Sequence, residues 1–182
     1  SKNKFDTLSL NRVHNFNQAQ LKTSPPENID EKPVETLFSK EETIFEKHQE
    51  NEYVDFDNEK IMPRALSREG PYGATADVNG DGLTDIYIGG AQGMIGQLYF
   101  QTSTGAFIKK EEVAFKPFFD FEDAANLFFD YDKDGDMDLL ICPGGNNHPL
   151  NSRELQLRLF NNDGKGNFAL NANAFPNMNM NI

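Results

Sequence analysis

Two acidic segments with the same spacing, DVNGDGLTD at residues 77–85 and DYDKDGDMD at residues 130–138, constrain the fold of this chain more than any other feature. Both fit the pattern D-x-[DN]-x-D-G-x-x-D. Side-chain oxygens at positions 1, 3 and 5 converge when the backbone curls around a hard cation, and glycine at position 6 permits the sharp turn. Position 7 then supplies a backbone carbonyl and position 9 a carboxylate. The spacing therefore predicts two calcium loops, with ligands Asp77, Asn79, Asp81, Leu83 and Asp85 in the first and Asp130, Asp132, Asp134, Asp136 and Asp138 in the second.

The residues that follow each loop distinguish it from an EF-hand. An EF-hand carries Glu at position 12 and lies between two helices. Position 12 here is Ile88 in the first loop and Ile141 in the second. The following segments, DIYIGG and DLLICPGG, are rich in β-branched and apolar residues and end in two glycines, which is typical of strands. We therefore expect each loop to join two strands of a hairpin. The alternative, an acidic turn without metal, stays open at this stage.

The same order of short apolar segments surrounds both loops. GATADV, DIYIGGA, QLYFQT and AFIKKEEVAF come first, and ANLFFDYD, DLLICPGG, LQLRLFN and NFALNANAF repeat that order. Four strands in roughly 40–50 residues is the period of propeller blades. The sequence thus predicts an all-β chain, a partial β-propeller with four-stranded blades at residues 73–125 and 126–176. NDGKG, at residues 162–166, is predicted to be a hairpin turn rather than a third metal loop.

The residues before the first blade lack this pattern. Residues 1–33 are polar and predict a partly disordered lead-in. Residues 34–72 form a leading segment, in which residues 34–45 fit a short helix or a strand followed by a loop. Because closed propellers have 4–8 blades, we expect a fragment of a larger propeller, with residues 177–182 leading toward a next blade. Alternatively, the N-terminal segment supplies strands to a partial third blade. Open sheet edges also predict self-association.

The charge of the chain limits its partners. A formal net charge of −12 argues against nucleic acid and anionic membranes as partners. The chain contains no run of about 20 apolar residues, so we expect no membrane-inserted helix. The N-terminal segment SKNKFDTLSL has no apolar signal region. Without the eight aspartates of the two loops, 21 acidic residues stand against 17 basic ones, and the net charge becomes −4. Most of the charge excess therefore lies where a cation would neutralise it.

No catalytic motif stands out elsewhere in the chain. The three histidines, His14, His48 and His148, lie far apart and lack the spacing of a zinc site. The glycine-rich segment at residues 89–96 lies between two strands, so it predicts a loop rather than a phosphate site. A carboxylate pair for glycoside cleavage is the weaker explanation of the aspartates, because their spacing already suits metal ligands. We expect no catalytic residues and two structural Ca²⁺ ions.

Two smaller features have structural explanations. The single cysteine, Cys142, stands in the strand-like segment LLICPG and is predicted to be a small buried residue. Arg64, Arg68 and Glu69 lie within PRALSREG, which predicts an ion pair, with contacts to an acidic ligand as the alternative.

The two repeats, GATADVNGDGLTDIYIGGA and NLFFDYDKDGDMDLLICPGG, resemble FG-GAP or VCBS repeats, the calcium-bearing blades of β-propellers in integrin α-subunits and many bacterial secreted proteins. HQENEYVDFDNEKIMPRALSREGP, at residues 48–71, resembles the start of a narrower group, the ASPIC/UnbV or cartilage-acidic-protein-like propellers. The resemblance extends over about residues 36–176. It implies Ca²⁺ at positions 1, 3, 5, 7 and 9 of each loop. It also implies an extracellular or cell-surface location, which in a bacterium would mean a protein that is secreted or faces the periplasm.

These observations favour a non-enzymatic binding or adhesion scaffold whose ligand is an unknown protein or glycan. The alternative is part of a carbohydrate-active enzyme whose catalytic residues lie outside the chain or on the propeller face. The lack of a compact catalytic motif favours the scaffold.

Overall fold

The computed structural model describes residues 42–58, 60–61, 63, 67, 70–145, 147–149 and 151–175. The chain divides into two compact units, Ser1–Glu42 and Thr43–Ile182, and all described residues except Glu42 belong to the second. The predictions for residues 1–33, for residues 177–182 and for Arg64, Arg68 and Glu69 lie outside the described residues, as does most of the ambiguous segment at residues 34–45. Within the described part of the chain, no helix is both long and apolar enough to span a membrane.

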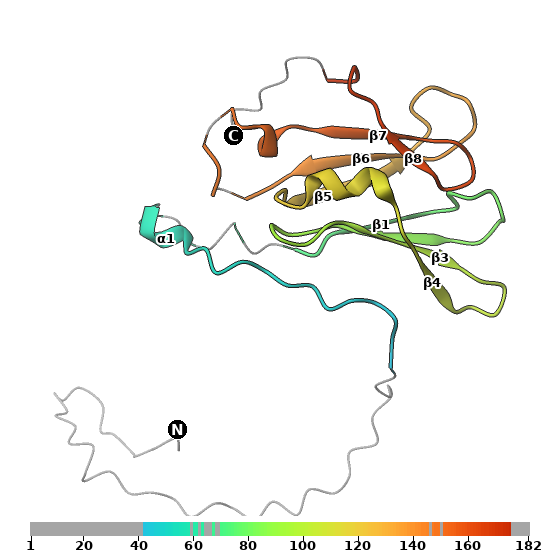
Figure 1. The fold of residues 1–182 in the computed structure, drawn as a ribbon, viewed down its shortest axis with the longest axis horizontal. Helices are drawn as coiled ribbons and strands as arrows, with labels where there is room; N and C mark the ends of the chain where they lie inside the picture. The colour runs from blue at the N-terminus through green and yellow to red at the C-terminus, as the bar shows by residue number, and fades with distance from the viewer. Residues whose placement is uncertain are drawn as a thin grey trace, which may run out of the picture. The chain divides into compact units, whose positions relative to one another are not determined.

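The described chain forms two four-stranded antiparallel sheets (Figure 1), and in each sheet strands that follow one another in sequence are neighbours. The first sheet consists of β1 (Gly73–Ala76), β2 (Asp85–Ile88), β3 (Gln97–Gln101) and β4 (Phe107–Lys110). The second consists of β5 (Asp123–Phe129), β6 (Asp138–Pro143), β7 (Arg158–Asn162) and β8 (Phe168–Leu170). Each predicted strand segment overlaps one observed strand. The prediction of an all-β chain with two four-stranded blades is therefore confirmed.

The residues after β4 correct one detail of that prediction. The segment AFIKKEEVAF was expected to be one long strand, but β4 ends at Lys110 and a 3-10 helix, η1 (Val113–Phe118), follows. The Glu112 side chain accepts a hydrogen bond from the backbone N–H of Ala114 at 3.1 Å and so caps the helix. Pro117 has no N–H to donate to a strand ladder. The helix therefore replaces the end of the predicted strand.

Three further differences concern the connections. A one-turn helix, α1 (Asp55–Asn58), lies in the leading segment, and a second 3-10 helix, η2 (Arg153–Leu155), precedes β7 where the sequence predicted strand from residue 155. β5 begins at Asp123, before the blade boundary expected at residue 126. The glycine-rich segment between β2 and β3 is a loop, as predicted.

The hydrophobic core lies between the two sheets and is organised around Phe115 of η1. Its ring lies 5.4 Å from the ring of Tyr87 in the first sheet, measured between centroids. It lies 5.2 Å from Phe160 and 5.9 Å from Phe168 in the second. Leu98 and Leu139, both fully buried, extend the same cluster. η1 therefore connects the sheets in sequence and also packs between them.

A buried polar network also joins the two sheets. The Asp123 carboxylate at the start of β5 accepts hydrogen bonds from Tyr87 Oη at 2.9 Å and from the Gly90 N–H at 2.8 Å. Arg158 of β7 donates to its other oxygen at 2.6 Å. Burial, followed by the negative charge of Asp123, raises the pKa of Tyr87 well above its ordinary value, so Tyr87 stays a donor. The network fixes β2 against β5 and β7.

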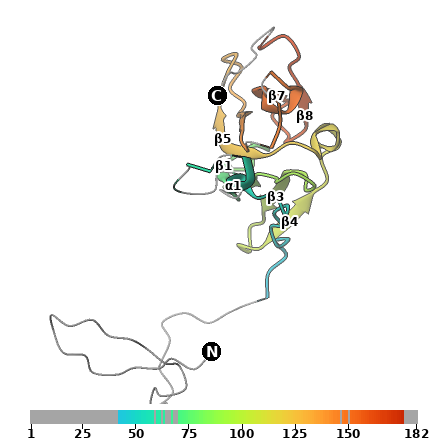
Figure 2. The same cartoon turned by 90° about the vertical axis from the view of Figure 1, so that its left-hand side faces the viewer.

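Residues 45–46, which precede α1, pack on the other face of the first sheet, where the ribbon runs past β3 and β4 (Figure 2). Phe45 packs edge-on against Tyr99 at a centroid distance of 4.7 Å and against Phe107 at 5.4 Å. The backbone N–H of Glu46 donates to Tyr99 Oη at 3.2 Å, and the Glu46 carboxylate pairs with Lys109 at 2.5 Å. This segment therefore protects an apolar sheet face that would otherwise meet water.

Candidate metal centre

The loop between β5 and β6 brings three predicted ligands together. Asp130, Asp132 and Asp138 each offer a carboxylate oxygen, and these oxygens lie within 4.8 Å of one another. Ligand oxygens at 2.3–2.6 Å from a Ca²⁺ ion are at most about 5.2 Å apart, on opposite sides of the ion. The separation of the three carboxylates is therefore compatible with a single bound cation.

Asp130 carries an oxygen that has no hydrogen-bond partner in the described part of the chain. Its Oδ2 accepts a hydrogen bond from the Gly135 N–H at 3.2 Å. Its Oδ1 is shielded from solvent and has no hydrogen-bond partner among the described residues. A shielded carboxylate oxygen without a donor is costly unless a cation or water satisfies it. This orphaned atom, in a group of three carboxylates, independently indicates a cation site.

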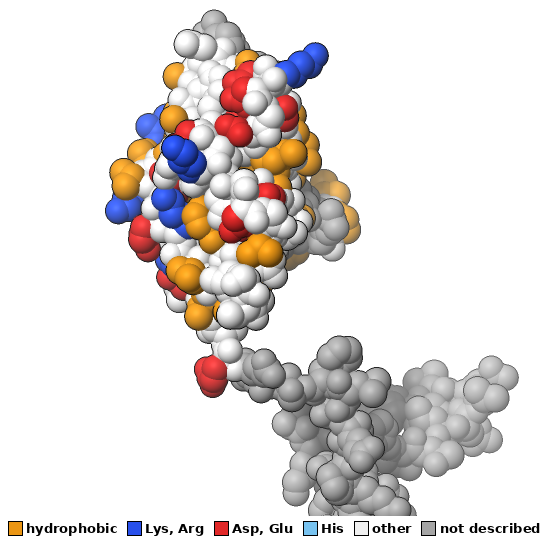
Figure 3. All heavy atoms as spheres, turned by 90° about the vertical axis from the view of Figure 1, so that its right-hand side faces the viewer, with side chains coloured by type: hydrophobic (Ala, Val, Ile, Leu, Met, Phe, Trp, Pro, Cys, Tyr) orange, Lys and Arg blue, Asp and Glu red, His pale blue; other side chains and the backbone are white. Residues whose placement is uncertain are grey.

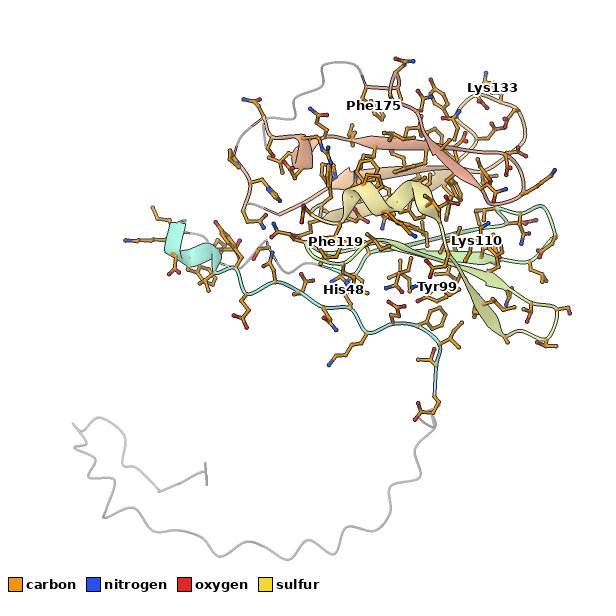
Figure 4. The ribbon with its side chains drawn as sticks, in the orientation of Figure 1. His48, Tyr99, Lys110, Phe119, Lys133 and Phe175 are labelled. Atoms are coloured by element: carbon orange, nitrogen blue, oxygen red, sulfur yellow. The ribbon has the colours of Figure 1, made fainter. Side chains whose placement is uncertain are left out.

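The backbone of this loop curls as the sequence pattern requires. Lys133, labelled at the tip of the loop in Figure 4, and Gly135 have φ angles of 66° and 97°, in the left-handed region. Asp132 Oδ1 accepts from the Asp134 N–H at 3.3 Å, and Asp134 Oδ1 accepts from the Asp136 N–H at 3.0 Å. The chain therefore turns tightly enough for positions 1, 3 and 9 to converge.

Asp134 and Asp136 do not join the group of three. The Asp136 carboxylate lies against the β7–β8 hairpin, where a β-carbon on Gly164 would approach its Oδ1 to 2.6 Å. The side chain of Asp136 therefore points away from the three carboxylates, as expected for a loop position that would offer its backbone carbonyl to a cation. Desolvation and the charge of Asp134 raise the pKa of both Asp132 and Asp136. A bound cation would relieve this repulsion.

Position 9 of each loop has a structural role that the sequence pattern did not reveal. Asp138 is buried, and its two oxygens accept from the N–H groups of Tyr131 and Asn162, each at 2.9 Å. The two carboxylate oxygens of Asp85 likewise accept from the backbone N–H groups of Val78 at 3.1 Å and Gln101 at 2.9 Å. Burial raises the pKa of Asp85, and these two backbone donors oppose the increase. The closing aspartate thus ties its loop to the third strand of the sheet whether or not a metal is bound.

The loop between β1 and β2 is arranged differently. Asp77 Oδ1 accepts from the N–H groups of Gly80 and Asp81 at 2.8 and 3.2 Å, and its Oδ2 accepts from Gly82 at 2.8 Å. Asn79 Oδ1 accepts from Asp81 at 3.0 Å, and Asp81 Oδ1 accepts from Leu83 at 2.8 Å. The predicted ligands of this loop are therefore engaged by its own amides. Its carboxylates are not part of the close acidic group found among the described residues.

Two asparagines of β7 contact the loops, and sequence reasoning missed both. Asn162 Nδ2 donates to the Val78 carbonyl of the first loop at 2.7 Å and to the Met137 carbonyl of the second at 3.1 Å. Asn161 Nδ2 donates to Asp132 Oδ2 at 3.3 Å. The only sequence signal is the pair of asparagines that ends the segment LRLFNN. The two loops therefore share one hydrogen-bonded framework.

The remaining polar candidates do not add ligands. The segment NDGKG forms the β7–β8 turn, as predicted: Asp163 accepts from the N–H groups of Lys165 at 2.9 Å and Asn167 at 3.2 Å. The Asn167 side chain, followed by these amides, lowers the pKa of Asp163. His48 bonds Glu50 at 2.6 Å. Cys142 is half-buried in β6, and desolvation raises the pKa of its thiol.

Both loops lie on the same face of the molecule. Figure 3 shows two clusters of acidic side chains on this face, one above the other, with white and orange surface between them. Two stacked four-stranded sheets, each with an acidic loop between its first and second strands, define part of a β-propeller with acidic-loop repeats.

A family model described as an FG-GAP-like repeat matches residues 77–141, from the first position of the first loop into β6. The match spans both acidic loops and supports the FG-GAP part of the resemblance. The narrower ASPIC/UnbV grouping stays a prediction. No curated protein matches the chain in a sequence comparison.

Proposed function

We propose that this chain is a calcium-binding, extracellular β-propeller module that serves as a scaffold for binding a protein or a glycan. The observation that carries the calcium proposal is the second loop, where Asp130, Asp132 and Asp138 converge and one Asp130 oxygen has no hydrogen-bond partner among the described residues. Hard cations prefer such all-oxygen sites. The FG-GAP-like match supports the same ion and an extracellular location, because FG-GAP repeats often bind calcium and are typically extracellular.

The ion would be structural. In the second loop it would be held by the three converging carboxylates, together with Asp134 and the backbone carbonyl of Asp136. Its charge would offset the repulsion among five aspartates in nine residues. It would also fasten the end of β5 to the start of β6. Extracellular modules bind Ca²⁺ with dissociation constants of about 10⁻⁴–10⁻³ M, which suits calcium levels outside cells.

The two loops should differ in affinity. The first loop has three aspartates and the neutral Asn79, whereas the second has five aspartates. Affinity rises with the number of charged ligands. Asp77 alone accepts three hydrogen bonds within the first loop, which leaves it fewer free lone pairs for a cation. We propose that the second loop binds the tighter ion and the first loop the weaker one.

Isothermal titration calorimetry of the calcium-free protein tests this proposal. The wild type should bind two Ca²⁺ ions with unequal affinity. Asp132→Asn, which gives the second loop the neutral ligand that Asn79 supplies in the first, should weaken the tighter event, and Asp81→Asn should weaken the other. Asp120→Asn is the matched control, since Asp120 is exposed and lies outside both loops. A wild-type protein that takes up no Ca²⁺ at millimolar concentration would contradict the metal proposal.

The scaffold role requires a different experiment. We propose retention of a protein or glycan without turnover, since the described residues present carboxylates for metal binding rather than a paired acid and base. A glycan array combined with a polysaccharide hydrolysis screen separates the two classes. Retention without hydrolysis supports the scaffold, and hydrolysis would favour the carbohydrate-active enzyme. We also propose that the chain is related to the narrower ASPIC/UnbV group. We further propose that the open blades associate with one another.

A further inference from the structure

A pocket lies at the end of the second sheet opposite the acidic loops. Its volume is about 530 Å³, within the range of small-molecule sites. Its walls come from η1, η2 and the segment that begins with β8 and ends at Phe175, which is labelled in Figure 4. Arg158, at the start of β7, lines it, whereas Asn162, at the other end of β7, contacts the loops. The pocket is therefore separate from the candidate metal centre.

The apolar walls are held in place by the core. Phe118 and Phe121 pack edge-on with a centroid distance of 5.0 Å, and Phe118 also packs against Phe160 at 5.5 Å. Leu170 forms another wall and keeps 44% of its surface exposed. Rings anchored to β7 are expected to move little when a ligand enters. The pocket therefore offers a preformed apolar surface.

Two guanidinium groups line this apolar surface. Arg158 lies over the rings of Phe121 at 4.7 Å and Phe118 at 5.2 Å. Its charge is balanced by Asp123, but its Nε is shielded from solvent and has no hydrogen-bond partner among the described residues. Arg153 lies over Phe121 at 5.1 Å and donates to the Pro117 carbonyl at 3.2 Å.

The charge on the pocket wall is therefore positive. Arg153 is exposed, and in the described part of the chain no carboxylate forms an ion pair with it. The chain as a whole carries a net charge of −12, so two guanidinium groups at one pocket stand against an acidic background. A ligand that combines a negatively charged hydrogen-bond acceptor with an apolar body would match both the guanidinium groups and the apolar walls.

We infer that this pocket binds a small organic acid with one carboxylate on an aromatic or branched aliphatic body. The carboxylate accepts from Arg153, since guanidinium and carboxylate groups form short, charge-assisted hydrogen bonds. The body packs against Phe118, Phe121 and Leu170. The inference does not depend on calcium or on the proposed scaffold role.

Ligand-observed NMR and calorimetry with two probes test the inference. The probes are 3-phenylpropionate and its neutral analogue 3-phenylpropionamide, which have the same body. The acid should bind at least about tenfold more tightly than the amide, because a hydrogen bond to a charged partner is stronger than a neutral one. Equal affinity of the two probes, or no binding of the acid at millimolar concentration, would overturn the inference.

Matched variants locate the site. Arg153→Gln should weaken the acid about tenfold and leave the amide unchanged. Lys165→Gln, which removes one exposed positive charge at the far hairpin turn, should leave the acid unchanged. Leu170→Asp should abolish binding of the acid, whereas Leu170→Asn should weaken both probes alike. If Arg153→Gln and Lys165→Gln have the same effect, the acid binds elsewhere. The titrations are run both in EDTA and in Ca²⁺, so their outcome is independent of the metal proposal.

Discussion

The structural role of Asp138 and the proposed metal-binding role of Asp132 can be separated by stability measurements with and without Ca²⁺. Asp138 is buried, and both of its oxygens accept backbone hydrogen bonds. Asp138→Asn replaces one acceptor with an NH₂ group, so one amide of Tyr131 or Asn162 loses its carboxylate partner. A hydrogen bond to a charged group contributes about 1.5–3 kcal/mol. We expect the free energy of unfolding in EDTA to fall by about this amount.

Asp132→Asn should behave in the opposite way. Asp132 is exposed, and desolvation followed by the charge of Asp134 raises its pKa, so removing its charge should leave stability in EDTA unchanged or slightly higher. In 5 mM Ca²⁺, a site with a dissociation constant of about 10⁻⁴–10⁻³ M stabilises the native state by about 1–2.3 kcal/mol. The variant should lose much of this gain, because an amide oxygen is a weaker Ca²⁺ ligand than a carboxylate.

Urea unfolding followed by circular dichroism, in EDTA and in 5 mM Ca²⁺, measures both effects. Asp120→Asn again serves as the control for removal of an exposed carboxylate. If Asp138→Asn is as stable as the wild type in EDTA, Asp138 has no metal-independent role. If the wild type has the same stability in both buffers, the ion is not bound.

Three further perturbations test the packing of the blades. Phe115→Ala should lower the free energy of unfolding by about 3–5 kcal/mol, because the ring fills the core between the sheets, and thermal denaturation measures the loss. Tyr87→Phe should cost about 1.5–3 kcal/mol, since it removes a donor to the buried Asp123 carboxylate; urea unfolding unchanged from wild type would contradict that role. Self-association should be detectable by sedimentation at high concentration, and Leu127→Asp should reduce it, because Leu127 is 54% exposed on β5; a monomeric wild type would count against this prediction.

The strands could be predicted from sequence because local patterns determine them. Each acidic loop ends in an aspartate that is also the first residue of the next strand, Asp85 for β2 and Asp138 for β6. Once these positions are known, the pairing of the apolar segments on either side of each loop can be predicted. The 3-10 helix at residues 113–118 could not be predicted in this way. Its sequence favours a strand, and packing of Phe115 between the two sheets overrides that preference.

The candidate site was only partly visible in the sequence. The loop pattern identified Asp130, Asp132 and Asp138, which the structure brings together. It could not show that the carboxylate of Asp77 accepts hydrogen bonds from its own loop. It also could not show the contacts of Arg158 with Asp123, since 35 residues separate the two side chains in sequence. Interactions over such distances leave no local signal.

The connection through Asn162 has a consequence for how the two loops respond to an ion. Its side-chain amide donates to one carbonyl of each loop, Val78 and Met137. A neutral hydrogen bond contributes about 0.5–1.5 kcal/mol, which limits the coupling that this connection can transmit. Calcium in the second loop would therefore order the first loop only modestly. The first loop, which satisfies its carboxylates with its own amides, can keep its conformation without an ion.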